Sequence, residues 1–452
     1  MRNSFDFTLR SLLATMVAVV LAIACDGGAQ DASPSPAAPQ GTAPVSTSGD
    51  LPCDVATVLN ERCASCHGAV PSYGAPMPLV TRGDLLAPAN SEKHRRVIDL
   101  VPGRIADARR TMPPAPNNPL SERERQLLET WIAAGAPAGQ ACASKAAAAP
   151  PTKPLGCQPD VRLRPSKAAV IATDKVDQYV CYGIQRNTKT KRHVVGLAPH
   201  IDNAARVHHV LLFQTIEPLG EEPKPCDAGA SAAWKLIAGW APGVGPLELP
   251  AAAGFPEEGT TNWALQVHYN NAGAIPGQVD ASGYDLCTTD ELRPNDADMM
   301  ATGSLDFAIP PRASYDLSCD HRWGSSGFAK DDEVPTIRVF SVFPHMHKLG
   351  QTMSVEKLSS AFRTPIPVMP KQLFDFDSQY NRPVEALVSP GEVLRTRCGW
   401  KNATDARVTA GEGTNDEMCF AFLMYYPRVK SINWTWNVPS GGPGTVCEET
   451  VR

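Results

Sequence analysis

The sequence predicts a multidomain protein in which a small all-α domain is followed by a pair of all-β, jelly-roll-like sandwiches. Helical patterns with capping signals gather between residues 51 and 142. From Cys157 to the end, short apolar strands alternate with Gly, Pro and Asn turns, and no long amphipathic helix interrupts them. The 42 prolines among 452 residues also favour strands and loops. About 300 residues of β-structure imply two sandwiches, and we expect them at 157–296 and 297–452.

The N-terminal segment predicts export. Two arginines flank a short polar region, and the apolar run over residues 11–24 is too short for a typical transmembrane helix. This run ends in Leu-Ala-Ile-Ala before Cys25, which resembles a bacterial lipoprotein cleavage box. We therefore expect residues 1–24 to be a signal peptide and Cys25 to carry lipid, so that the protein is periplasmic and anchored to a membrane. An ordinary cleaved signal and a retained anchor are the alternatives.

Two low-complexity segments separate the expected domains. Residues 25–50 consist almost entirely of small and polar residues and proline. Such a segment buries too little apolar surface to fold, so it predicts a disordered tether. Residues 143–156 form a second linker, which its prolines stiffen.

The all-α unit at 51–142 carries a haem attachment signature. Residues 54–60 predict a helix that leads into Cys63-Ala64-Ser65-Cys66-His67. In a C-x-x-C-H motif the two thiols reach the two vinyl groups of the macrocycle, and the histidine supplies the proximal iron ligand. The motif therefore predicts one covalently bound c-type haem at Cys63, Cys66 and His67. A zinc or redox C-x-x-C site is the alternative.

A second axial ligand is expected further along this unit. Met112 stands before two prolines, which place its thioether on a stiff loop, and it is the expected distal ligand. Met77 and His94 are the alternatives. A helix is predicted over residues 121–132, with a capping box of Ser121 and Glu124. This order of features resembles the small class I cytochromes c.

The number of cysteines fits a protein of an oxidising compartment. Of 13 cysteines, Cys25 is assigned to lipid and Cys63 and Cys66 to haem, which leaves an even number in an exported protein. The ten fit five disulfides, whose connectivity does not follow from spacing. They are Cys53, Cys142, Cys157, Cys181, Cys226, Cys287, Cys319, Cys398, Cys419 and Cys447. Because Cys53 and Cys142 bracket the all-α unit, they could join its ends.

His345 and His347 follow a β-branched run at 336–342 that predicts a strand. Residues two apart on a strand point to the same face, so two imidazoles can converge on one metal ion from a rigid support. Imidazole suits copper, zinc, iron or nickel. Two histidines on a solvated strand end are the alternative.

Three more histidines lie on expected strands. His208 and His209 are adjacent, and neighbours on a regular strand face opposite ways, so joint ligation requires a bulge or different ring nitrogens. His268 lies on another strand, and Met418 follows later in Asp-Glu-Met-Cys. Five histidines and one methionine divide into a site of three imidazoles and a site of two imidazoles with a thioether. A soft thioether favours Cu(I) over zinc.

These motifs resemble the copper type II, ascorbate-dependent monooxygenases over residues 157–452. The motifs are V-H-H-V-L-L-F, L-Q-V-H-Y, I-P-P, P-H-M-H-K-L-G and D-E-M-C. The resemblance implies two copper ions and hydroxylation of an activated C–H bond with O2. The matching ligands of the electron-storing copper are His208, His209 and His268. Those of the oxygen-binding, catalytic copper are His345, His347 and Met418.

The resemblance also implies disulfides and a substrate site. The implied disulfide pairs are Cys157–Cys287, Cys181–Cys226, Cys319–Cys447 and Cys398–Cys419. In the peptide-hydroxylating member, an arginine, an asparagine and a tyrosine hold the substrate carboxylate, and the matching positions here are Phe343, Phe420 and Phe422. A desolvated carboxylate without a partner costs several kcal/mol. We therefore expect a small-molecule or apolar organic substrate in this pocket.

Together these features predict a copper monooxygenase with a fused haem. The haem is expected to relay electrons to the three-histidine copper from a periplasmic donor or an ascorbate-like reductant. The alternatives are a non-catalytic haem–copper electron carrier and a copper-storage protein. A net charge of −5 and a pI near 6.1 give no electrostatic basis for nucleic-acid binding.

Overall fold

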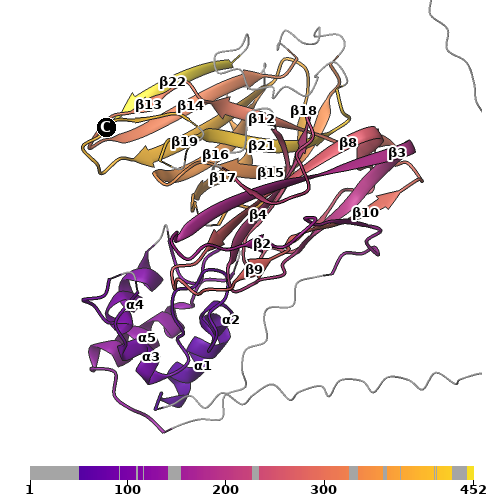
Figure 1. The fold of residues 1–452 in the computed structure, drawn as a ribbon. Coiled ribbons are helices and arrows are strands. Elements are labelled where there is room, and N and C mark those ends of the chain that lie inside the picture. Colours follow the sequence, from indigo (N-terminus) through magenta and orange to yellow (C-terminus); the bar gives the residue numbers. More distant parts are fainter. Residues whose placement is uncertain are drawn as a thin grey trace, which may run out of the picture. The chain divides into compact units, whose positions relative to one another are not determined.

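The computed structural model describes residues 50–90, 92–107, 110–115, 117–140, 154–226, 234–324, 334–359, 364–376, 378–411, 413, 415–429 and 445–452. The expected signal peptide, Cys25, the tether, Cys142 and most of the second linker lie outside these residues. Within them, none of the helices has both the length and the apolar character needed to cross a membrane. Figure 1 shows a helical unit and two strand-rich domains.

The helical unit contains five helices in the described range 50–140. They are α1 (Cys53–Arg62), α2 (Ala64–His67), α3 (Arg82–Leu86), α4 (Val97–Ala106) and α5 (Glu122–Ala133). The expected capping box is present, since the Ser121 side chain accepts from the Glu124 N–H and the Glu124 carboxylate accepts from the Ser121 N–H. Glu124 also accepts from Arg62 at 2.7 Å, which joins α5 to α1. A small core that includes Leu59, Leu128 and Trp131 holds the helices together.

The first β domain is built on one twisted sheet with strand order β1-β10-β3-β8-β4-β6. Three short strands, β5, β7 and β11, pair at its margins, and β2 pairs with β9. The bounds are β1 Val161–Leu163, β2 Ala169–Val170, β3 Asp177–His200, β4 Val207–Thr215, β5 Lys224–Pro225, β6 Trp234–Trp240, β7 Leu247–Glu248, β8 Ala253–Asn270, β9 Val279–Asp280, β10 Gly283–Thr289 and β11 Asn295–Asp296. The alternating apolar residues of these strands form one core cluster.

The second β domain has a four-stranded sheet, β12-β21-β15-β18, and a five-stranded sheet, β17-β16-β19-β14-β22. A short pair, β13 and β20, adds to them. The bounds are β12 Asp298–Ser304, β13 Ala308–Ile309, β14 Ser314–Arg322, β15 Ile337–His345, β16 Gly350–Leu358, β17 Ile366–Leu373, β18 Arg382–Val388, β19 Val393–Lys401, β20 Val408–Thr409, β21 Cys419–Tyr426 and β22 Thr445–Val451. Both sheets contribute to a second core cluster. Sheet membership changes at Ala297, because β11 pairs in the first domain and β12 in the second.

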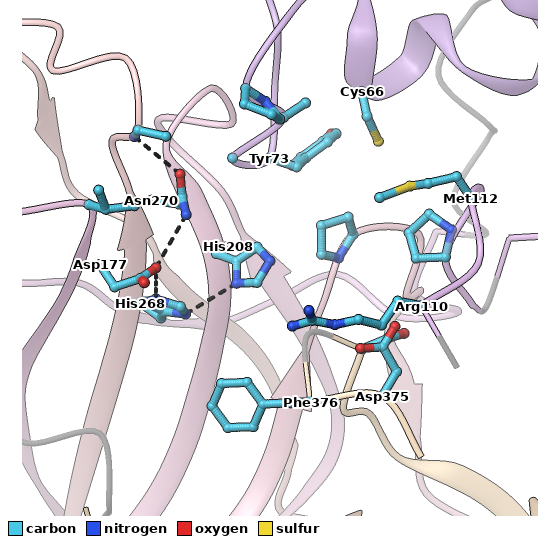
Figure 2. Close-up of a pocket in the computed structure, with 18 of the residues that line it drawn as sticks. Cys66, Tyr73, Arg110, Met112, Asp177, His208, His268, Asn270, Asp375 and Phe376 are labelled. Carbon is cyan, nitrogen blue, oxygen red and sulfur yellow. Dashed lines mark hydrogen bonds and ion pairs between the residues drawn. The ribbon is translucent and has the colours of Figure 1, made fainter. Parts of the chain in front are cut away.

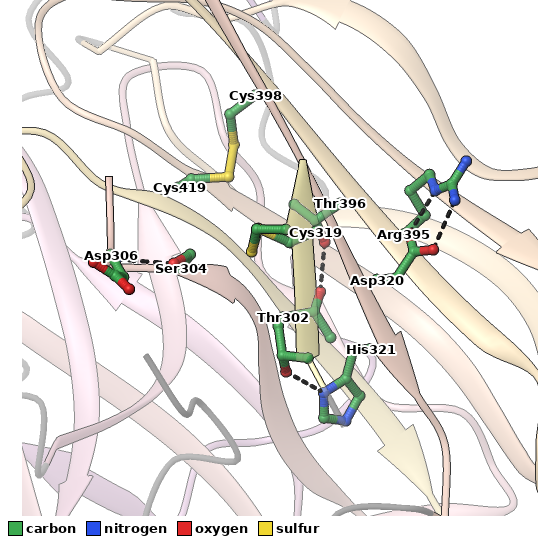
Figure 3. Close-up of a disulfide and its surroundings, with 12 residues drawn as sticks. Thr302, Ser304, Asp306, Cys319, Asp320, His321, Arg395, Thr396, Cys398 and Cys419 are labelled. Atoms are coloured by element: carbon green, nitrogen blue, oxygen red, sulfur yellow. Dashed lines mark hydrogen bonds and ion pairs between the residues drawn. A yellow bond between two sulfur atoms is a disulfide. The ribbon is translucent and has the colours of Figure 1, made fainter. Parts of the chain in front are cut away.

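Four disulfides lie in the β domains, and they are the pairs that the resemblance implies. They join Cys157 to Cys287, Cys181 to Cys226, Cys319 to Cys447 and Cys398 to Cys419. Figure 3 shows Cys398–Cys419, which connects β19 to the first residue of β21. Cys53 is also disulfide-bonded. Its expected partner Cys142 lies outside the described residues, so that pairing stays a prediction.

Candidate metal centres

Three histidines of the first β domain converge on one point. His208 and His209 lie on β4, and His268 lies on the neighbouring strand β8. The pairing of β4 with β8 shifts register between Val207 and His209, which is the bulge that joint use of adjacent histidines requires. One ligand atom from each ring lies within 4.8 Å of the others. The Nδ1 atom of His268 lies 3.1 Å from Nδ1 of His208 and 3.4 Å from Nδ1 of His209.

The ring orientations at this site fit a bound cation. The Nε2–H of His268 donates to Asp177 at 3.0 Å, which turns its Nδ1 lone pair toward the other two rings. Burial lowers the pKa of His209 well below its usual value, so this ring is neutral near pH 7. The Nδ1 atoms of the three rings face one another, so one cation between them can accept a lone pair from each ring. The donor set therefore fits a copper ion held by three nitrogens.

Asp177 fixes the ring of His268 and should tune this site. The hydrogen bond to His268 lowers the pKa of the Asp177 carboxyl, so it is ionised near neutral pH. We expect Asp177→Ala to weaken copper binding at the three-histidine site by about 10–100-fold, because the ring loses its orienting partner. Competition with a chromogenic chelator measures the affinity. Asp174→Ala, at an exposed acid three residues away, is the control, and equal affinities in the two variants would contradict this role.

His345, His347 and Met418 come from neighbouring parts of the second β domain. His345 ends β15, and His347 lies in the turn that follows, with ring centroids 5.3 Å apart. β15 pairs with β21 so that His345 lies opposite Phe420, two residues beyond Met418. Met418 is buried at 6 % exposure. Pairing of β15 with β21 therefore brings the methionine segment to the end of the strand that carries the histidines.

Hydrogen bonds orient both imidazoles of this second set. The Nδ1–H of His345 donates to the side-chain oxygen of Gln379 at 2.7 Å. The Nδ1–H of His347 donates to the carbonyl of Asp416 at 3.0 Å. Burial lowers the pKa of His345 to about 3 and also lowers that of His347, so both rings are neutral with Nε2 lone pairs left for a metal. Two nitrogens and a thioether suit Cu(I).

Glu417 holds the histidine turn against the methionine segment. Its carboxylate is 1 % exposed and accepts from the backbone N–H groups of His347 at 2.9 Å and Leu349 at 2.6 Å. The indole N–H of Trp400 donates to it at 2.9 Å. Burial raises the pKa of Glu417 to about 7. One buried carboxylate thus fixes the residue next to Met418 relative to the backbone of His347.

A cavity of about 840 Å³ joins the C-x-x-C-H motif to the three-histidine site. Cys66, His67 and Met112 line it from the helical unit, and His208 and His268 line it from the first β domain. Figure 2 shows Met112 and Cys66 on one side and His208 and His268 on the other. The volume lies in the upper part of the range for small-molecule and cofactor sites.

The residues around this cavity fit a c-type haem. Cys63 and Cys66 are the free cysteines of the described part of the chain. The Nδ1–H of His67 donates to the carbonyl of Met77 at 2.8 Å, which leaves Nε2 for iron. Burial lowers the pKa of His67, so the ring is neutral. Of the three candidates for the distal ligand, Met112 alone lines the cavity, while Met77 packs against the helical core and His94 is exposed.

The three phenylalanines assigned to a substrate pocket are buried together. Phe343, Phe420 and Phe422 are 1 %, 3 % and 5 % exposed. They share an apolar cluster with Met418 and with residues of the first β domain, including Leu236. None of the three lines the 840 Å³ cavity. Their surroundings are apolar, but in this structure the rings pack against one another.

Four other histidines were expected to be structural or on the surface. His193 is buried and bonds Asp296 at 2.9 Å, and His321 is buried beside Thr445. His94 and His200 are exposed. None of the four belongs to the convergent histidine group among the described residues.

Several residues that support the metal sites were missed in the sequence. Asp177, Gln379 and Glu417 each orient a ligand or its backbone. Glu417 had a signal, because it precedes Met418 in a matching motif. Asp177 and Gln379 had none, because each contacts a histidine 91 or 34 residues away in the chain.

Comparison with known proteins agrees with this geometry. Residues 164–275 match the copper type II ascorbate-dependent monooxygenase N-terminal domain, and residues 295–439 match the C-terminal domain of the same family. The chain is 30% identical to peptidyl-glycine alpha-amidating monooxygenase A of Xenopus laevis, over 55% of this chain and 26% of the relative. It is 27% identical to tyramine beta-hydroxylase of Caenorhabditis briggsae, over 52% and 42%. It is also 27% identical to putative DBH-like monooxygenase protein 2 of Homo sapiens, over 53% and 51%.

The chain thus spans about a quarter to a half of the length of these curated relatives. Both family matches fall in the part that holds the five histidines and Met418. The two β domains of this chain therefore belong to the copper type II ascorbate-dependent monooxygenase family.

Proposed function

We propose that the protein is a copper-dependent monooxygenase that hydroxylates an activated C–H bond, with a fused c-type haem as its electron relay. The observation that carries the proposal is the presence of two dissimilar ligand sets in one chain. One is the all-nitrogen set of His208, His209 and His268. The other is the set of His345, His347 and Met418.

The reaction consumes one C–H bond, O2, two electrons and two protons, and yields an alcohol and water. Two bound copper ions would supply the one-electron chemistry and the activation of O2. The protein's own residues set the geometry. Asp177 and Gln379 fix one imidazole in each set, and Glu417 fixes the turn that carries His347. The buried apolar cluster around Met418 keeps water from that ligand.

The haem relay is supported by the way the helical unit meets the first β domain. A Cβ on Gly74 of the helical unit would lie 3.0 Å from Cβ of Asn270 and within van der Waals contact, at 3.5 Å, of Cδ2 of His208. The Tyr73 N–H donates to the carbonyl of Ala204, and its ring lies 6.0 Å from that of Trp240. A haem on Cys63 and Cys66 would occupy the cavity that His208 and His268 also line. Electrons would then enter at the three-histidine site.

We propose that this chemistry takes place outside the cytoplasm, because the N-terminal segment predicts export. We infer that a lipid on Cys25 anchors the protein in a bacterial membrane facing the periplasm, where a periplasmic donor or an ascorbate-like reductant would supply electrons. Disulfides in both β domains suit that oxidising compartment.

A copper-storage protein or a simple electron carrier fits less well. Storage has no use for two chemically different sites, and a carrier has no use for a second copper set with a thioether. Metal analysis with EPR on the full chain tests the proposal. We expect one haem and two type 2 copper ions per chain, and ¹⁸O from ¹⁸O2 in the product of an aromatic or aliphatic test substrate. A chain that binds fewer than two copper ions would contradict the proposal.

The substrate is expected to lack a carboxylate near the reacting carbon. A substrate beside Met418 would lie against the apolar cluster that contains Phe343, Phe420 and Phe422. These side chains offer no cation or hydrogen-bond donor, and a carboxylate buried against them without a partner costs several kcal/mol. We expect a glycine-extended peptide to bind at least about 100-fold more weakly than an aromatic substrate, which matches about 2.7 kcal/mol. Calorimetric titration measures both. Micromolar binding of the peptide would contradict this assignment.

A further inference from the structure

A segment of the second β domain, made of residues 374–376 and 378–381, contacts all three parts of the structure. Phe376 lies between the two proposed copper sites, with its ring edge-on to His209 at 6.3 Å and to His347 at 6.1 Å between centroids. It also lines the 840 Å³ cavity, where Figure 2 shows it below His208. One aromatic ring therefore faces a ligand of each copper set and the space proposed for the haem.

Two amides of the segment hold it to the β domains. Gln379 accepts from Nδ1–H of His345 at 2.7 Å, and its own side-chain N–H donates to the carbonyl of Phe376 at 2.9 Å. The orientation of His345 is thereby tied to the position of Phe376. Asn381 accepts from the backbone N–H of Gly239, in the first β domain, at 3.0 Å. The segment thus joins a ligand of the second site to the first domain.

The helical unit holds the same segment from the other side. The hydroxyl of Ser378, which is 6 % exposed, donates to the carbonyl of Ala115. Ala115 follows the proposed distal ligand Met112 by three residues. Asn117, in the same loop, lies against Gly243 of the first β domain, where a Cβ would come within 2.9 Å of the amide nitrogen. The loop of the distal ligand therefore contacts both β domains.

We propose that docking of the helical unit, through the bond from Ser378 to Ala115, positions this segment and thereby sets the spacing of the two copper sites. The proposal rests on the proposed function, because it requires both sites to hold copper. Phe376 contacts both His209 and His347, so its position depends on the spacing of these two rings. Through its hydrogen bond to His345, Gln379 makes the orientation of that ring depend on the position of the segment. Phe376, Ser378 and Gln379 are positioning residues, since none of them is a metal ligand.

The segment is held by a few hydrogen bonds and ring contacts, and few other contacts could replace any one of them. Ser378→Ala removes the donor of this hydrogen bond, so the segment loses its bond to the Ala115 carbonyl and can move away from the helical unit. Removal of a group that orients a metal ligand changes metal binding about 10–100-fold. Loss of the Ser378 hydrogen bond should therefore change the geometry of the copper sites, although Ser378 contacts neither site.

Pulsed EPR on the full, haem-containing chain tests this proposal. The chain is loaded with two equivalents of copper sulfate, and the distribution of Cu(II)–Cu(II) distances is measured. We expect one narrow distribution for the unaltered chain and a shifted or broadened one for both Ser378→Ala and Phe376→Ala. Ser389→Ala is the matched control, because its hydroxyl accepts from the hydroxyl of Thr336, so this bond lies within the second β domain and does not involve the helical unit. Its distribution should equal that of the unaltered chain.

The outcomes separate this proposal from the proposed function. If the variants bind two copper ions with an unchanged distance distribution, the positioning role is wrong and the monooxygenase proposal stands. If the unaltered chain binds fewer than two copper ions, the proposed function is wrong, and this proposal is wrong with it. Phe376→Leu keeps an apolar side chain and guards against a variant that does not fold. A changed distribution in Phe376→Leu with none in Ser378→Ala would overturn the role of the helical unit.

Discussion

Met418→Leu is expected to abolish hydroxylation while the three-histidine site keeps its copper. Leucine nearly conserves the volume of methionine, so the buried cluster should lose less than about 1.5 kcal/mol of stability. The thioether, however, is the only sulfur ligand of the second set. We expect copper affinity at that site and turnover to fall by more than about 100-fold, beyond the loss of a group that only orients a ligand.

Copper analysis and turnover measured on the same sample check this prediction. One copper ion per chain should remain, with the EPR signal of a nitrogen-only site. Met424→Leu, at a buried methionine in the strand β21 that directly follows Met418, is the control and should keep both ions. Two tightly bound copper ions with normal turnover in Met418→Leu would remove Met418 from the site.

The second large effect is expected on replacing both haem-attaching cysteines with alanine. Cys63→Ala with Cys66→Ala removes both thioether bonds, so the chain should contain no covalent haem. The copper sites lie in other domains and should still bind two ions. Reduction of copper by a small redox protein should slow by at least about 100-fold. Without the haem, electrons from that protein must reach the copper over a longer distance. A small chemical reductant such as ascorbate should still reduce the copper.

Haem staining of the denatured chain and the rate of loss of the Cu(II) EPR signal measure these two effects. Ser65→Ala changes the middle of the same motif and should keep haem and reduction rate. If the double variant is reduced by the redox protein as fast as the unaltered chain, the haem is not the relay.

Local patterns in the sequence predicted the parts of the sites that lie on single strands. Strand alternation predicted that His345 and His347 lie together, and their ring centroids are 5.3 Å apart, although β15 ends at His345 and His347 lies in the turn after it. The adjacent pair His208 and His209 required a bulge, which the pairing of β4 with β8 contains. The four disulfides of the β domains followed from the resemblance, not from spacing.

The contacts between domains were not predictable in this way. Asp177, Phe376 and Gln379 act on histidines that lie far away in the chain, and no periodicity marks such residues. The bond from Ser378 to Ala115 spans 263 residues and joins two separate domains. The apolar positions Phe343, Phe420 and Phe422 were assigned to a pocket because their character matches an apolar ligand. The same apolar side chains can equally well pack against Leu236 and its neighbours, and only the three-dimensional structure distinguishes a pocket from packing.

In this proposal the haem and both copper sites act as one electron-transfer unit that consumes O2. Stopped-flow mixing of the fully reduced, metal-loaded chain with O2 and an aromatic substrate tests it most directly, with the haem followed by absorbance and copper by freeze-quench EPR. We predict that the haem is oxidised in the same phase as copper and that product forms in that phase. A haem that stays ferrous while both copper ions are oxidised would contradict the account.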